Sequence, residues 1–270
     1  MMRTNTSIER VDQLILRSDA IYGAIDPEFD GEPRAKRMLR VGINTLALSL
    51  RRGESVERAG ARLLTLPNVF ARTKAPLDEL SDMYADIRRA THDRDGNLET
   101  DARHAIHLMK LAVPYAREFY PELDQGRIAA YALIHDIIEA YVGDVPSLVM
   151  TAEQEQQKQL DEAQALIRLH EEYGEEWPEF IALIESYEAL DTPEACFVKT
   201  FDKLDPGFTH FYSHGAQLKS HYGLSEDSFY VAIDKATQRM QRYSGEYGQI
   251  MEDRDELTRR VAHVAFKNAA

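Results

Sequence analysis

The chain has 270 residues, of which 44% are hydrophobic, enough for one full core and with room for a second helical subdomain beside it. Acidic residues outnumber basic ones by 46 to 32, and the formal charge of −14 argues against a nucleic-acid partner. A single cysteine excludes an intrachain disulfide, and neither a secretory signal nor a membrane span is visible, so we expect a soluble cytoplasmic protein without a membrane partner.

Hydrophobic residues recur along the chain with the 3.6-residue period of an α-helix, and no convincing strand-like alternation occurs, which predicts an all-α fold. After Pro33 the pattern predicts a helix that stops at Gly53 and a short helix that Ser55 can cap. A third apolar stripe starts at Leu77. The polar stretch 91–100 is expected to be a turn-rich loop, and we place the start of the central domain just before it.

Two helices in the middle of the chain carry ionisable residues on apolar surfaces. Thr100 can cap the first, and its core-facing stripe includes His104. The second, residues 128–142, is apolar nearly all round and is predicted to be a buried central helix. Buried ionisable groups are costly unless they are paired or bound to a cation. This helix contains three of them, His135, Asp136 and Glu139.

The spacing of these residues indicates a metal site. His135 and Glu139 are four residues apart and project from the same side of a helix, while Asp136 leans about 100° away. His104 from the preceding helix and Asp202 from a later one can complete a set of two imidazoles and two carboxylates. Such a mixed nitrogen and oxygen set suits Mn, Co, Fe or Zn.

Three segments resemble the HD superfamily, and specifically its branch of 5'-deoxynucleotidases and related small nucleotide hydrolases. They are ETDARHA at 99–105, ALIHDIIEAYVGDVPSL at 132–148 and TPEACFVKTFDKLDP at 192–206. The family shows an E-x-V-A-E-H-S-like segment, then H-D-x-x-E-A-x-x-G-D-x-P, then S-P-E-A-x-x-V-K-x-x-D-K-L. The second and third segments match closely, and the resemblance covers roughly residues 86–210.

The resemblance implies an all-α HD-domain helical bundle over residues 86–215. Residues 1–85 are then an N-terminal helical extension of unknown role, and residues 216–270 are C-terminal helices that pack on the HD domain.

The resemblance also implies one divalent metal ion, which can be Mn, Co, Fe, Zn or Mg. His170 is the only histidine between the HD pair and the final aspartate, which favours one metal over two. His107 competes with His104 for the role of first ligand, because it shares part of the same helix face. A second HD pair, His92-Asp93, lies in the polar loop and is interpreted as non-catalytic. The implied ligands are His104, His135, Asp136 and Asp202.

Further roles follow from the resemblance alone. Glu139 is expected to move protons, and Asp144 to position the attacking water or a sugar hydroxyl. The family places an Arg-Trp pair in the nucleotide pocket, and its counterpart here is Arg89-Ala90. Because the tryptophan ring of the family is absent here, we expect the pocket to discriminate less between one sugar and another and between one base and another. The candidates for binding the substrate phosphate are Arg89 and, ranked lower, Arg94, Lys199 and Lys203.

The expected activity is metal-dependent hydrolysis of nucleotide phosphate esters, with (deoxy)nucleoside 5'-monophosphates giving nucleoside and orthophosphate. A dNTP triphosphohydrolase that releases tripolyphosphate is the nearest alternative. An HD-type signalling phosphodiesterase and a catalytically inactive nucleotide-binding regulator are more distant ones. The partner is thus a small-molecule nucleotide, and the sequence leaves a homodimer open.

Overall fold

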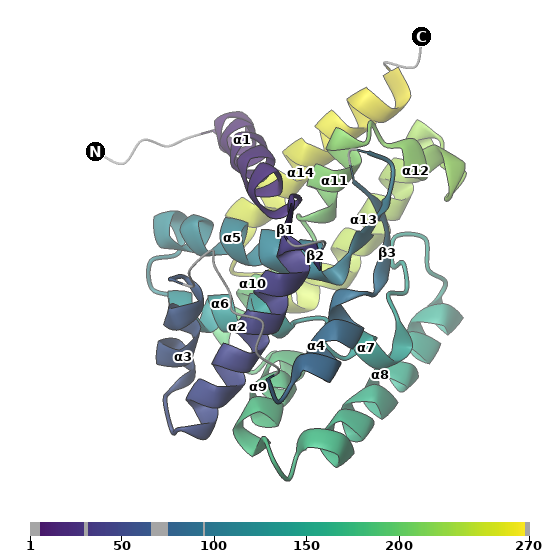
Figure 1. Cartoon of the computed structure of the whole chain (residues 1–270). Coiled ribbons are helices and arrows are strands. Elements are labelled where there is room, and N and C mark those ends of the chain that lie inside the picture. The colour runs from purple at the N-terminus through teal and green to yellow at the C-terminus, as the bar shows by residue number, and fades with distance from the viewer. Residues whose placement is uncertain (1–5, 30–31, 66–74, 94, 268–270) are drawn as a thin grey trace.

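The computed structural model describes residues 6–29, 32–65, 75–93 and 95–267, and these are mostly helical, so the predicted all-α fold is confirmed (Figure 1). Two short antiparallel hairpins, β1-β2 and β3-β4, accompany the helices. The elements are α1 (Ser7–Ile25), β1 (Glu28–Phe29), β2 (Glu32–Pro33), α2 (Arg34–Arg51), α3 (Val56–Leu63), α4 (Asp78–Ala85), β3 (Arg88–His92), β4 (Leu98–Thr100), α5 (Asp101–Phe119), α6 (Gln125–Ile134), α7 (Glu139–Val142), α8 (Ala152–Tyr173), α9 (Pro178–Ala189), α10 (Pro193–Asp202), α11 (Pro206–Tyr212), α12 (Ala216–Ser220), α13 (Glu226–Ser244), α14 (Gly248–Ala262) and the π-helical turn η1 (His263–Lys267).

The helix starts that the sequence indicated are confirmed by their caps. The side chain of Ser55 accepts a hydrogen bond from the backbone N–H of Arg58 at the start of α3. Thr100 caps α5 in the same way. Thr192, which the sequence analysis did not name as a cap, caps α10, whose first residue is a proline. Each cap satisfies a backbone donor that has no partner inside its helix. None of the helices in the described ranges is both long and apolar enough to cross a membrane.

The stretch predicted to be a turn-rich loop instead contains the hairpin β3-β4. Arg88 pairs with Thr100 and His92 with Leu98 across the two strands. Along β3 the buried positions are Arg89 and Thr91, so polar side chains carry the inward face of the strand. The buried and less buried positions of β3 therefore do not differ in hydropathy, so the two-residue alternation by which a strand is recognised is not visible in the sequence.

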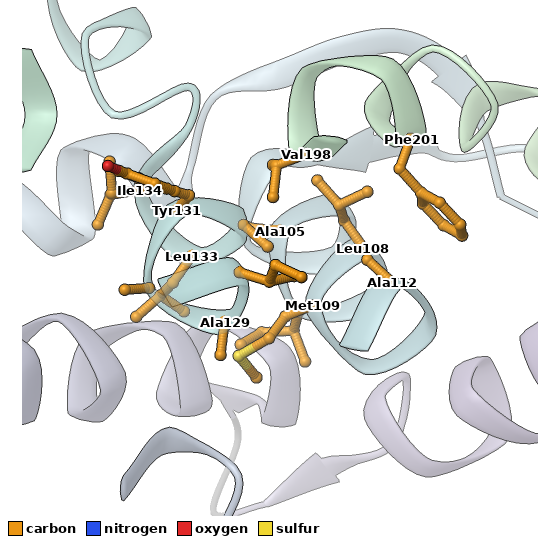
Figure 2. Close-up of a cluster of buried hydrophobic side chains, with 14 of the residues drawn as sticks. Ala105, Leu108, Met109, Ala112, Ala129, Tyr131, Leu133, Ile134, Val198 and Phe201 are labelled. Carbon is orange, nitrogen blue, oxygen red and sulfur yellow. The ribbon is translucent and has the colours of Figure 1, made fainter. Parts of the chain in front are cut away.

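The core of the catalytic region lies between α5, α6 and α10. Figure 2 shows small and large apolar side chains from these three helices in one buried cluster. Helices α2 and α3, from the predicted N-terminal extension, pack against α5 and α6. The predicted domain boundaries at 85/86 and 215/216 remain predictions. The residues labelled in Figure 2 are Ala105, Leu108, Met109, Ala112, Ala129, Tyr131, Leu133, Ile134, Val198 and Phe201.

The first and last long helices meet at a buried ion pair. Helix α1 packs on α5 and on α14, the yellow helix in Figure 1. The guanidinium of Arg10 donates to Asp253 with Nε 2.8 Å from Oδ1, and the hydroxyl of Tyr115 donates to Oδ2 of the same carboxylate at 2.8 Å. One carboxylate thus holds α1, α5 and α14 together.

Helices α3 and α6 touch through two glycines. A Cβ atom built on Gly60 would lie 1.8 Å from the carbonyl oxygen of Gly126, and one built on Gly126 would lie 1.9 Å from the carbonyl oxygen of Glu57. No side chain fits at either position unless the backbones move apart.

We therefore expect Gly60→Ala to lower the free energy of unfolding by about 1–3 kcal/mol, because the overpacking outweighs the roughly 1 kcal/mol that alanine gains over glycine in a helix. Urea titration followed by circular dichroism measures this change. Gly23→Ala in α1 is the matched control, since nothing lies within 4 Å of its added Cβ and the variant should be neutral or slightly more stable. Equal stability of the two variants would contradict the close approach of α3 and α6.

Candidate metal centre

Three helices bring the four predicted metal ligands together. His104 comes from α5, His135 and Asp136 follow the end of α6, and Asp202 is the last residue of α10. One ligand atom from each lies within 4.8 Å of the others, and all four residues are buried. The Nε2 atom of His104 is 3.1 Å from Nε2 of His135 and 3.0 Å from Oδ1 of Asp202.

The chain around the HD pair differs from the predicted continuous helix over residues 128–142. Helix α6 ends at Ile134, and α7 begins at Glu139. Between them the backbone bonds from i to i−3, as from the N–H of Ile137 to the carbonyl of Ile134 at 3.0 Å. This tighter winding changes the directions of successive side chains. Nε2 of His135 lies 2.9 Å from Oδ2 of Asp136, so these two adjacent side chains reach the same point.

Both imidazoles have their other nitrogen fixed by an acceptor. Nδ1 of His135 lies 2.9 Å from the carbonyl oxygen of Ala132, and Nδ1 of His104 lies 2.8 Å from Oδ2 of Asp205. A proton on each Nδ1 satisfies these contacts and leaves the lone pairs on the two Nε2 atoms facing each other. Two lone pairs and two carboxylates at this spacing favour a cation between them, and the donor set suits a divalent metal.

The electrostatics of the centre also favour a bound cation. Burial and the charge of Arg89 lower the pKa of His104, but the hydrogen bonds with Asp202 and Asp205 outweigh them and raise it to about 10. The surrounding carboxylates thus stabilise positive charge at this position.

His107, the competing ligand, points away from the centre. Its Nδ1 lies 2.7 Å from Oδ1 of Asp205, and its Nε2 lies 2.9 Å from the hydroxyl of Ser18 in α1. Its ring stacks on Tyr22 with the centroids 4.0 Å apart. Both nitrogens are engaged, so His107 supports the site through Asp205, which in turn contacts His104. Sequence reasoning did not assign Asp205, although it lies in the third matched segment.

Arg89, expected to hold phosphate, lies beside carboxylates. Its Nη1 atom donates to Oδ2 of Asp136 at 2.8 Å and to Oδ1 of Asp101 at 3.0 Å. The neighbouring backbone N–H of Ala90 donates to Oδ2 of Asp144 at 3.1 Å. The hairpin therefore anchors both Asp136 and Asp144. Sequence reasoning missed Asp101, which fills a position where the family pattern has valine.

Glu139 is buried at the inner end of α7. Its Oε1 atom lies 3.5 Å from Nζ of Lys158, and its Oε2 atom has no hydrogen-bond partner among the described residues. Burial, together with the charges of Asp136 and Asp101, raises the pKa of Glu139 well above its ordinary value. The carboxyl therefore favours its protonated form. Lys158 lies in the acidic helix α8, and part of this helix borders the site.

A cavity of about 290 Å³ opens onto the centre. Its walls include Glu139, Asp144, Lys199 and Lys203, and the Nζ atom of Lys203 lies 2.6 Å from Oδ2 of Asp202. Arg94, another expected phosphate-binding residue, falls outside the described residues. Asp136 and Asp202 also line this cavity, so ligands and candidate catalytic residues share one space.

The second HD pair lies apart from the ligand cluster. His92 ends β3, and its Nε2 atom is 3.4 Å from Nε2 of Gln217. Asp93 accepts hydrogen bonds from the backbone N–H groups of Asp95 and Asn97, both at 2.9 Å. These contacts are those of a residue that stabilises a hairpin turn.

Comparison with known proteins agrees with this geometry. A family model described as the HD domain matches residues 84–243, more than half of the chain. Among solved structures, a predicted metal-dependent phosphohydrolase from Magnetospirillum magnetotacticum MS-1 is 30% identical with a TM-score of 0.53. The alignment covers 68% of this chain and 90% of that chain. No curated protein matches significantly. The chain belongs to the HD-domain family.

Proposed function

We propose that this protein is a metal-dependent phosphohydrolase that hydrolyses nucleotide phosphate esters, foremost (deoxy)nucleoside 5'-monophosphates. The observation that carries the proposal is the convergence of two imidazole nitrogens and two carboxylates within 4.8 Å beside an open cavity. Membership in the HD-domain family and the similarity to a predicted metal-dependent phosphohydrolase support the reaction class. The nucleotide substrate rests on the resemblance to the 5'-deoxynucleotidase branch.

The donors that would hold the metal are His104, His135, Asp136 and Asp202. A bound divalent ion lowers the pKa of a coordinated water and polarises a phosphoryl oxygen. Mn, Co, Fe, Zn and Mg all fit a set of nitrogen and oxygen donors to some degree, with the transition ions favoured by the imidazoles.

The remaining residues bind the substrate and transfer protons. Lys203 and Lys199 present ammonium groups to the cavity and can hold phosphate oxygens. Glu139 can give a proton to the leaving ester oxygen as its bond to phosphorus breaks. Asp144, held by the backbone of Ala90, accepts a hydrogen bond from the attacking water or a sugar hydroxyl. Nucleoside and orthophosphate are the products.

We expect chelation to abolish hydrolysis and a divalent transition ion to restore it, because this donor set makes a labile site. Asp202→Asn should lose metal and activity together, since it removes one of the two carboxylates. Metal content by mass spectrometry and phosphate release measure both effects. Asp191→Asn, at the exposed end of α9, serves as the control and should keep metal and activity. Full turnover by metal-free protein would refute the proposal.

Glu139→Ala should instead keep the metal and slow turnover by about a hundredfold or more, as expected for a proton-transfer group. The measurements are kcat and the metal content of the purified variant. Glu171→Ala removes an exposed carboxylate from α8 and should behave as the parent. Parental kcat in Glu139→Ala would show that this carboxyl has no catalytic role.

The inorganic product identifies the substrate class. Incubation with each dNMP, NMP and dNTP should release orthophosphate from several monophosphates, because Ala90 lacks the ring that would narrow the pocket. Anion-exchange chromatography separates orthophosphate from tripolyphosphate. Tripolyphosphate from a dNTP, with every monophosphate untouched, would instead favour the triphosphohydrolase.

A further inference from the structure

One histidine lines the cavity without taking part in the metal centre. His210 of α11 is among the residues around the cavity onto which the centre opens. Its Nδ1 atom is buried and has no hydrogen-bond partner within the described part of the chain. Its Nε2 atom forms no hydrogen bond there either and is not buried, so it is the atom that can meet a ligand in the cavity. Most polar atoms inside proteins have a partner, and a ring without one beside a cavity indicates a partner from outside the chain.

The surroundings of His210 keep its ring uncharged. Burial lowers the pKa of His210 to about 4, an effect that the charge of Glu99 opposes and that of His92 reinforces. A neutral imidazole has one N–H donor and one acceptor nitrogen. Because an unpaired buried N–H is rarer than an unpaired buried acceptor, the proton favours Nε2 over the buried Nδ1. His210 therefore offers the cavity an uncharged donor, which suits a neutral acceptor better than a phosphate.

Two elements place His210 at a distance from the metal centre. Helix α11 follows Asp205, which supports the centre, and five residues of helix rise by about 7.5 Å. The helix packs on β3. In this strand Arg89 donates to Asp136 at the centre, whereas His92, at the other end of the strand, is the residue whose charge acts on His210. These offsets place His210 beside the leaving group of a bound ester, away from the attacked phosphate.

The residues between the metal centre and His210 leave room for a ring. Ala90 has only a methyl group, and its backbone N–H holds the carboxylate of Asp144 at 3.1 Å. Burial and the charge of Asp144 raise the pKa of Tyr222 to about 12, so this phenol lies near that carboxylate. All four residues line the same cavity. A carboxylate that can accept from a sugar hydroxyl is thus accompanied by a methyl group, an aromatic ring and the neutral donor of His210.

We propose that His210 binds the nucleobase of the substrate by donating a hydrogen bond from Nε2 to an acceptor of the base. This inference rests on the proposed function and names a residue that recognises its leaving group. Purines carry an acceptor at N3 and pyrimidines at O2, so one donor can serve every base. His210 thereby favours nucleotides over other phosphate esters without selecting among the bases, in keeping with the hydrolysis of several monophosphates.

The test compares kcat/KM for deoxyadenosine 5'-monophosphate, deoxycytidine 5'-monophosphate and 2-deoxyribose 5-phosphate, which lacks a base. We expect the parent protein to prefer both nucleotides by about tenfold or more, because the base leaves a polar group unpaired when its donor is absent. His210→Phe keeps an aromatic ring but removes the donor, so it should reduce this preference about tenfold. His210→Gln should restore most of the preference, since its amide N–H can replace that of Nε2.

His170→Phe is the matched control, because it removes an exposed histidine of α8. It should keep the parental preference. Equal kcat/KM for all three compounds in the parent would overturn the inference whether or not the variants fold. An unchanged preference in His210→Phe would overturn it as well, and in both cases the release of orthophosphate from monophosphates would still support the proposed function.

Binding separates the two proposals if no nucleotide is hydrolysed. Titration calorimetry with deoxyadenosine 5'-monophosphate and the metal-loaded protein should give a Kd that rises about tenfold in His210→Phe and is unchanged in His170→Phe. That result would support the role of His210 although the proposed function had failed. A Kd that is equal in all three proteins would refute it.

Discussion

The metal centre depends on two hydrogen bonds that fix the direction of its histidines. One joins Nδ1 of His104 to Asp205, and the other joins Nδ1 of His135 to the carbonyl oxygen of Ala132. When each ring carries its proton on Nδ1, as these acceptors favour, the lone pairs of the two Nε2 atoms, 3.1 Å apart, face each other. A rotated ring would present a donor to the cation and destroy the site.

The cavity is divided electrostatically. Carboxylates gather where α6, α7 and the β3-β4 hairpin meet, and Arg89 compensates part of their charge. The cavity is also lined by basic side chains of α10, α13 and α14, among them Lys203, Arg239 and Arg254. Under the proposed function, a metal ion would lie next to the carboxylates and an anionic substrate next to these basic side chains. Helices α13 and α14 thereby line the cavity as well as contribute to the core.

The sequence predicted the parts of this structure that follow from local chemistry. Ser55 and Thr100 marked helix starts because their side chains satisfy backbone donors, and the all-α fold followed from the helical period. The candidate ligands were found because His135 and Asp136 interrupt an apolar stretch, where charge needs a partner. Their role as ligands remains a prediction, although the structure brings them together.

The structure differs from the sequence-based prediction where the local sequence pattern fits more than one backbone conformation. An apolar stretch looks the same whether its backbone bonds to i−4 or to i−3, so the turn between Ile134 and Glu139 could not be predicted. The strand β3 was hidden because its buried side chains, Arg89 and Thr91, are polar. His210 gave no signal either, since only the tertiary structure shows that it lines the cavity and that its Nδ1 atom has no hydrogen-bond partner in the described ranges.

The ion pair between Arg10 and Asp253 sets the order in which the molecule can be completed during synthesis. The two residues are 243 positions apart, so α1 cannot pack against α14 until the chain has been synthesised past Asp253. Helix α1 also supplies Ser18 and Tyr22, which hold His107 and, through Asp205, the ring of His104. A nascent chain that has already folded α5, α6 and α10 therefore still lacks this support for His104, a candidate ligand. Contacts between residues far apart in the sequence form slowly, and the candidate metal centre is fully supported only when they have formed.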